Sequence, residues 1–109
     1  MTPDDFRRHG HALIDWIADY REGLAARPVA PPTRPGEVRA LLPAEPPQGP
    51  EPFAGCLADL DRVVAPNLLH FQHPAFYGFF PANSELSGVL ADLASTGLGV
   101  VGLSWAAAP

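Results

Sequence analysis

The residues best suited to chemistry lie in one stretch of twelve, from His70 to Pro81. Two of them, His70 and His73, are imidazoles, which bind metals, transfer protons or form hydrogen bonds. Pro74, Gly78 and Pro81 interrupt the stretch and exclude a regular helix or a central strand. The pattern predicts irregular backbone that lines a pocket or an interface.

The same stretch carries five aromatic rings, whose role the sequence leaves open between packed core and ligand wall. Their spacing follows neither a helical nor an alternating period, which favours the wall. The rings belong to Phe71, Phe76, Tyr77, Phe79 and Phe80.

Three roles are open for the two histidines. Zinc binding requires further ligands, and no acid or cysteine lies near His70 and His73 in the sequence. Hydrogen bonding within a pocket wall is favoured, with acid–base catalysis or substrate contact as alternatives.

The chain contains no lysine. Its seven basic residues are all arginine and face twelve acids, for a net charge of −5. This balance gives no electrostatic footprint for nucleic acid or an anionic membrane. Cys56 is the single cysteine and no apolar window reaches bilayer length. We expect a soluble, cytoplasmic protein with neither nucleic-acid nor membrane partners.

The periodicity of apolar residues predicts a mostly α fold. A first helix over about residues 3–26 has its start signals in Thr2, Pro3 and the acids that follow. Two further helices are predicted over about 52–65 and 84–97, the last capped by Asn83 or Ser84.

Most of the fourteen prolines lie between Pro28 and Pro52, which predicts a proline-rich linker over 28–52 with at most a short docked turn in its middle. Three short apolar stripes cannot enclose one another. We therefore expect a three-helix arm that docks on other protein surface, since ordering costs roughly as much as this burial contributes.

Other motifs are weaker. Gly97 to Gly102 matches G-x-G-x-x-G, but a predicted helix precedes it where a dinucleotide site needs a strand. A helix stop or close backbone packing explains it better. Ser104 lacks the setting of a hydrolase nucleophile, and Cys56 has no neighbouring base. Both are interpreted as structural.

Residues over the whole chain form one joint pattern. In the first half they are Phe6-Arg7-Arg8, Gly10, Asp15, Tyr20, Pro35-Gly36, Leu41, Pro43 and Pro47. In the second half they are His70, Pro74, Phe76, Phe80-Pro81, Leu90-Ala91-Asp92, Gly99, Gly102, Ser104-Trp105-Ala106-Ala107 and Pro109. In this order and spacing the chain resembles the N-terminal segment of group II pyridoxal-phosphate-dependent decarboxylases, and among them the aromatic-L-amino-acid decarboxylases.

The resemblance implies a fold, a cofactor and a partner. Residues 1–109 would be a dimerisation and substrate-side arm of a type I, α/β, transferase-like enzyme that binds pyridoxal 5'-phosphate. The arms of two subunits would interlock in a homodimer. The large cofactor-binding domain would follow this segment and is absent from this chain.

The resemblance also implies site residues. The side of the active site that receives the ring of an aromatic substrate would be lined by Phe71, Phe79, Phe80, Pro81 and Ala82. Val101 and Leu103 would reach the same ring from the neighbouring subunit. Ala82 would also lie in the vicinity of the cofactor.

The resemblance also indicates why the absence of lysine matters for activity. Such enzymes hold their cofactor covalently on a lysine, which this chain lacks. We expect the chain alone to be an inactive fragment without catalytic residues of its own. The alternative is a non-enzymatic helical interaction or dimerisation module, which would have to fold by itself.

Three positions depart from the animal enzymes that act on catechol amino acids. Phe71, Phe79 and Ala82 stand where those enzymes carry Trp, Tyr and Thr. Loss of a hydroxyl that bonds the substrate weakens the preference for a hydroxylated ring. The sequence predicts less hydroxylated substrates, such as phenylalanine or tryptophan. It does not separate amine-forming from aldehyde-forming relatives.

Overall fold

The structure, a computed structural model, describes residues 1–79, 84–100, 102 and 104–106. Its described residues are mostly helical and contain no strand, which confirms the predicted fold class at this level. The chain divides into two compact units, Met1–Gly78 and Phe79–Pro109. None of the described helices is long and apolar enough to cross a membrane.

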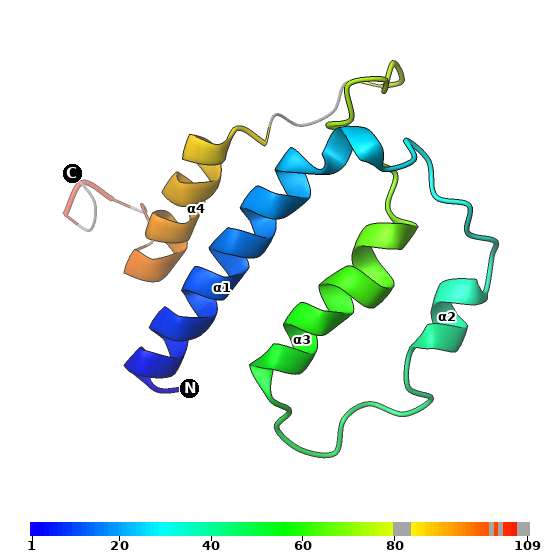
Figure 1. Cartoon of the computed structure of the whole chain (residues 1–109). Helices are drawn as coiled ribbons and strands as arrows, with labels where there is room; N and C mark the ends of the chain where they lie inside the picture. The colour runs from blue at the N-terminus through cyan, green and yellow to red at the C-terminus, as the bar shows by residue number, and fades with distance from the viewer. Residues whose placement is uncertain (80–83, 101, 103, 107–109) are drawn as a thin grey trace. The chain divides into compact units, whose positions relative to one another are not determined.

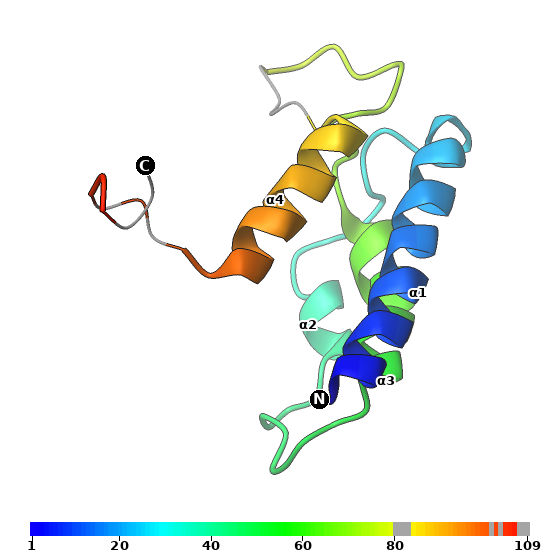
Figure 2. The same cartoon turned by 90° about the vertical axis from the view of Figure 1, so that its left-hand side faces the viewer.

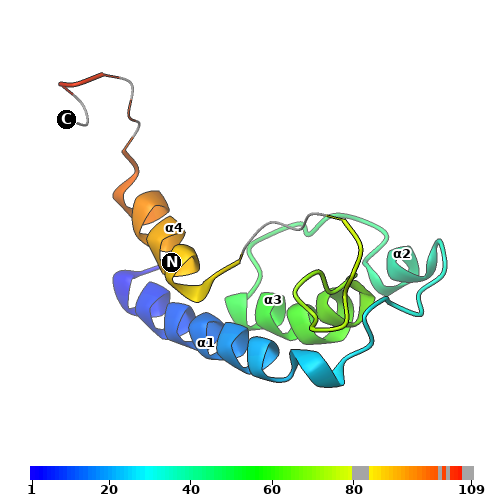
Figure 3. The same cartoon turned by 90° about the horizontal axis from the view of Figure 1, so that it is seen from above.

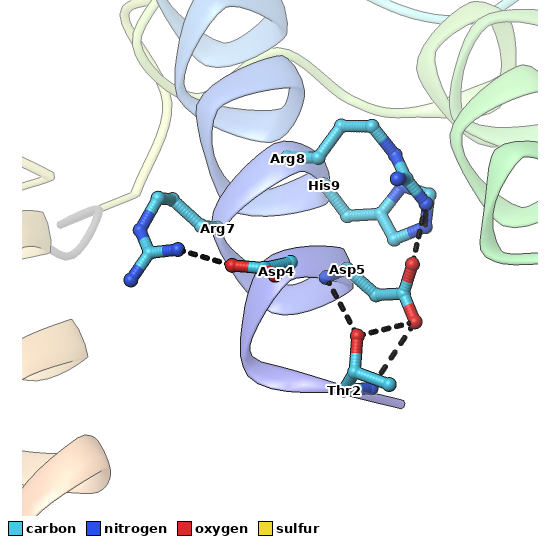
Figure 4. Close-up of polar contacts among 6 residues, drawn as sticks. All are labelled: Thr2, Asp4, Asp5, Arg7, Arg8 and His9. Carbon is cyan, nitrogen blue, oxygen red and sulfur yellow. Dashed lines mark hydrogen bonds and ion pairs between the residues drawn. The ribbon is translucent and has the colours of Figure 1, made fainter.

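The first helix, α1, spans Pro3–Glu22 and begins as its sequence signals predict. The Thr2 hydroxyl accepts a hydrogen bond from the Asp5 amide at 3.1 Å, and the Asp5 carboxylate accepts one from the Thr2 amide at 3.1 Å (Figure 4). These bonds satisfy amides that have no partner inside the helix. Hydrogen bonds from Thr2, assisted by Arg8, lower the pKa of the Asp5 carboxyl to about 2.

Helix α1 is shorter than the predicted span of 3–26. It ends at Glu22, and Gly23 leads into a separate 3₁₀ turn over Leu24–Ala26. The Leu24 side chain in this turn is buried. The tighter turn ends the helix before Pro28, which cannot continue it.

The connection between α1 and the next long helical segment contains one short helix. Helix α2 covers Glu37–Leu41, so the predicted linker over 28–52 is helical in its middle. Gly36 precedes it with φ of 94°, a conformation that favours glycine. Figure 2 shows this connection returning from the end of α1 to the start of α3.

The segment predicted as one helix over 52–65 changes its winding along its length. Helix α3 spans Phe53–Asp59, followed by a π-helical turn over Leu60–Val64 and a 3₁₀ turn over Ala65–Asn67. Pro66 lies inside the last turn and does not end the segment before it. The Asn67 side-chain amide donates to the Val63 carbonyl oxygen at 2.7 Å and closes this end.

Helix α1 and the segment that begins with α3 run side by side in the same direction (Figures 1 and 3). Their contacts advance together along both elements. They join His9 with Phe53 (ring centroids 5.0 Å apart), Trp16 Nε1 with Asp61 Oδ1 (2.9 Å) and Tyr20 Oη with His70 Nδ1 (2.7 Å).

The buried side chains of this unit gather at one end, where α1 and the α3 segment finish. They are Leu24, Val63, Ala65 and His70. The core therefore lies at the turns rather than along the interface between the two helices.

The second unit is described through α4, which spans Leu86–Leu98. Its N-cap is Glu85, whose carboxylate accepts from the Ser87 amide at 2.8 Å. The prediction of Ser84 as the cap is therefore wrong, and Asn83 lies outside the described residues. A carboxylate at this end also interacts favourably with the helix dipole.

Candidate functional site

The stretch singled out in the sequence folds back on itself with short-range hydrogen bonds. The His73 amide donates to the His70 carbonyl oxygen at 3.0 Å, and the Phe76 amide donates to that of His73 at 2.9 Å. The Ala75 amide donates to Nδ1 of His73 at 2.9 Å. The backbone is therefore irregular, as Pro74 and Gly78 predict, and hydrogen bonds within the stretch hold it in place.

His70 is the buried polar residue at the start of this stretch. Its side chain is 3% exposed, and its Nδ1 lies 2.7 Å from the Tyr20 hydroxyl. Burial, and then electrostatic interaction with Arg27 and His73, lower the pKa of the His70 imidazole. A hydrogen-bonded histidine was predicted here, and that part of the prediction is confirmed.

His73 differs from His70 in its bonding. Its Nδ1 accepts the bond from the Ala75 amide, so Nε2 carries the proton of the neutral ring. Nε2 is buried and has no hydrogen-bond partner among the described residues. Within the same ranges, no group of three His, Cys, Asp or Glu residues could hold a metal ion.

Two of the aromatic residues assigned to the substrate side are described. Phe71 is partly exposed, and its ring meets that of Phe76 edge to face, with centroids 5.2 Å apart. Phe79 is 80% exposed and has a φ of 50°, which is unusual for a bulky residue. These residues belong to different units of the chain, Phe71 to the first and Phe79 to the second.

The other assigned residues lie outside the described ranges. They are Phe80, Pro81, Ala82, Val101 and Leu103. Their roles stay predictions.

The glycine motif lies in a structural context that differs from that of a dinucleotide site. Helix α4 runs through Leu98, and Gly99 caps its end with φ of 62°. The motif therefore ends a helix, where a dinucleotide site would need it to open one. The interpretation as a helix stop is confirmed. Cys56 and Ser104 are both exposed.

The sequence did not predict the partner of His70. Tyr20 lies 50 positions earlier, on α1, and the two residues entered the sequence pattern separately. Tyr20 follows Leu13 and Ile17 at helical spacing, and this apolar stripe of α1 is the signal that points its ring inward. Nothing in the local pattern paired it with a histidine.

Comparison with known proteins covers the whole chain. The sequence model of the family described as "Pyridoxal-dependent decarboxylase conserved domain" matches residues 35–109. An aromatic-L-amino-acid decarboxylase of Rattus norvegicus is 39% identical over 109 residues, which are 100% of this chain and 23% of the relative. A tyrosine decarboxylase of Oryza sativa subsp. japonica is 44% identical over 111 residues, with 100% of this chain and 21% of the relative covered.

The chain is also similar to solved structures over its whole length. The crystal structure of Oryza sativa TDC with PLP and tryptamine matches with a TM-score of 0.92 and 32% identity. The match covers 100% of this chain and 23% of that one. The chain spans less than a quarter of the length of these relatives. It belongs to the pyridoxal-dependent decarboxylase family.

Proposed function

We propose that this chain forms the N-terminal, substrate-side part of a decarboxylase that uses pyridoxal 5'-phosphate and acts on aromatic L-amino acids. One observation carries the proposal: the whole chain matches such an enzyme in space, with a TM-score of 0.92 against a structure that holds PLP and tryptamine. The names of the relatives at 39% and 44% identity, an aromatic-L-amino-acid and a tyrosine decarboxylase, support the same substrate class.

The cofactor would be held by protein outside this chain. Pyridoxal phosphate enzymes hold the cofactor on a lysine amine, and the sequence contains no lysine. The residues present therefore do not fit covalent attachment of the cofactor. When bound, pyridoxal phosphate supplies the electron sink for loss of carbon dioxide. This chain would contribute binding and orientation of the substrate, and no covalent step.

The proposed substrate wall is apolar and aromatic. It comprises Phe71, Phe79, Phe80, Pro81 and Ala82 from one subunit, with Val101 and Leu103 from its partner, and Ala82 close to the cofactor. Surfaces of this kind exclude water and orient an aromatic ring by stacking and edge contacts. The left-handed backbone at Phe79 supports the proposal, because such strain costs roughly 1–3 kcal/mol and clusters at functional sites.

The proposed partner is a second copy of the enzyme, with this chain as the arm that joins the two subunits. The exposed leucines of α4 support this role, because an amphipathic helix contributes little stability until its apolar face is covered. The complete subunit would add the large cofactor-binding domain of a type I fold. A cytoplasmic location is supported by the free, exposed Cys56.

The test is an assay of the complete enzyme that carries this chain. We expect it to release carbon dioxide from aromatic L-amino acids, with a higher kcat/KM for phenylalanine or tryptophan than for DOPA. The matched variant is Ala82→Thr, which restores a hydroxyl and should shift the preference toward DOPA. Analysis of the product as amine or aldehyde assigns the reaction type.

Each part of the proposal has an outcome that contradicts it. No release of carbon dioxide from any aromatic amino acid would exclude the decarboxylase. A clear DOPA preference of the unsubstituted enzyme would exclude the substrate assignment. A cooperative thermal transition of the isolated, monomeric chain would favour the non-enzymatic interaction module.

A further inference from the structure

His70 ties three parts of the first unit together. Its imidazole Nδ1 lies 2.7 Å from the Tyr20 hydroxyl on α1. Its backbone amide donates to the Val29 carbonyl oxygen of the linker at 2.9 Å, and its own carbonyl oxygen accepts from the His73 amide at 3.0 Å. The aromatic segment, defined here as His70–Gly78, is therefore attached to α1 and to the linker at its first residue.

The hydroxyl that meets His70 is itself held in place. The Tyr20 ring stacks on Trp16 one helical turn earlier, with centroids 5.5 Å apart and an angle of 11° between planes. The Arg27 guanidinium lies 5.2 Å from the centroid of the Tyr20 ring. The stacking and the cation–π contact both hold the ring, so the position of the hydroxyl depends on α1 and the turn that follows it.

Internal contacts connect the aromatic segment to His70. Its amides bond within the segment from His73 to Phe76, and the rings of Phe71 and Phe76 meet edge to face. The Phe76 ring covers Gly78, where an added Cβ would lie 3.3 Å from the ring. A shift at His70 would therefore be passed to the Phe71 ring.

We propose that Tyr20 and His70 form a positioning pair, in which the hydrogen bond from α1 sets the place of the aromatic segment and hence of Phe71 in the substrate wall. This inference rests on the proposed function, because it needs Phe71 to face the substrate. It extends that function to a residue on α1, outside the wall. Neither member of the pair touches the reacting atoms in this proposal.

The test is the substitution Tyr20→Phe in the complete enzyme. Phenylalanine keeps the ring that contacts Trp16 and Arg27, removes the hydroxyl and leaves the buried His70 Nδ1 without that partner. We expect faster amide hydrogen exchange in peptides that cover residues 69–78. We also expect KM for the aromatic substrate to rise roughly two- to tenfold, the range of one lost hydrogen bond, with little change in kcat.

The matched control removes another hydrogen bond of α1. Asp4→Ala breaks the bond from Arg7 Nη1 to Asp4 Oδ1, which lies at the start of α1, at the opposite end of the helix from Tyr20. It should leave KM and exchange over residues 69–78 unchanged. A rescue series uses His70→Asn, whose amide can replace the polar atom near Nδ1, against His70→Leu, which cannot. The asparagine variant should lie nearer to the unsubstituted enzyme in KM.

Three results would overturn the pair. They are unchanged exchange and KM in Tyr20→Phe, equal effects of Asp4→Ala and Tyr20→Phe, and faster exchange without any change in KM. If the unsubstituted enzyme releases no carbon dioxide, the proposed function itself fails. The exchange rates then still decide whether Tyr20 holds the segment.

Discussion

The end of the first unit and helix α4 differ in where their apolar side chains find partners. In the first unit, Leu24, Val63 and Ala65 are buried beside His70, where α1 and the α3 segment finish. In α4 no side chain is buried within its own described unit. Its exposed large side chains are Leu86, Leu90, Leu93 and Leu98, between 44% and 75% accessible.

This difference separates self-contained stability from stability that a partner must provide. A fully buried leucine contributes roughly 1.5–3 kcal/mol relative to an exposed one. The first unit obtains this contribution from residues of the same chain, together with long-range hydrogen bonds such as Trp16–Asp61. At the start of α4, the Glu85 carboxylate bonds locally to the amide and hydroxyl of Ser87. The exposed apolar face of α4 therefore needs a covering surface.

Two alanine substitutions, one in each region, test this comparison, and we expect their effects on stability to differ strongly. In the complete enzyme, Leu24→Ala removes a buried side chain and should lower the free energy of local unfolding of the first unit by about 2–5 kcal/mol. Leu93→Ala removes a side chain outside this unit and should change that free energy by less than about 1 kcal/mol. Amide hydrogen exchange in peptides that cover the first unit measures both. Equal losses in the two variants would show that the two regions are not distinct.

The second prediction concerns the surface that covers α4. In the complete enzyme, Leu90→Glu places a charge on the helix face that also carries Leu86 and Leu93. If this face is buried between subunits, the unpaired charge should weaken dimer association by roughly tenfold or more. Sedimentation analysis over a range of protein concentrations measures the change.

The control for that substitution lies on the same helix. Ser95→Glu adds the same charge about 200° around the helix from Leu93, on the polar side. It should leave dimer association unchanged. An unaffected dimer in Leu90→Glu would contradict the role of α4 in the subunit interface.

The sequence predicted those features of the fold that local chemistry decides. The start of α1 follows from Thr2, Pro3 and Asp5, whose bonds lie within four residues of one another. The π-helical turn over Leu60–Val64 could not be predicted in this way, because an apolar stripe does not distinguish α from π winding over five residues. The cap of α4 was misplaced because Ser84 and Glu85 are both able to accept an amide bond, and tertiary context chooses between them.

The candidate site shows the same limit. The hydrogen-bonded state of His70 could be predicted, because a histidine within an apolar stretch needs a partner when it is buried. Its bond to Tyr20 spans 50 residues and depends on α1 and the α3 segment running in the same direction. Local periodicity carries no information on that direction. The aromatic pattern alone favoured a ligand wall, and the substrate-side roles of single residues came from the family resemblance.

The last prediction concerns how the stability of the first unit depends on pH, and its effect should be small. Histidine in an unfolded chain titrates at about 6.5, and burial beside Arg27 lowers the pKa of His70 in the folded chain. Below pH 6.5 the unfolded chain therefore takes up a proton that the folded chain resists, so acid favours unfolding. The free energy of unfolding should fall from pH 7.5 to 5.5 with a slope from this residue of at most about 1.4 kcal/mol per pH unit, and should level off below the lowered pKa. Amide hydrogen exchange over residues 69–78 of the complete enzyme at pH 7.5, 6.5 and 5.5, corrected for the intrinsic exchange rate at each pH, measures this free energy locally. His70→Leu is the control that should lose this part of the slope. Identical slopes in the two proteins would show that His70 does not contribute to the pH dependence, and that the buried end of the first unit accepts a charge without loss of stability.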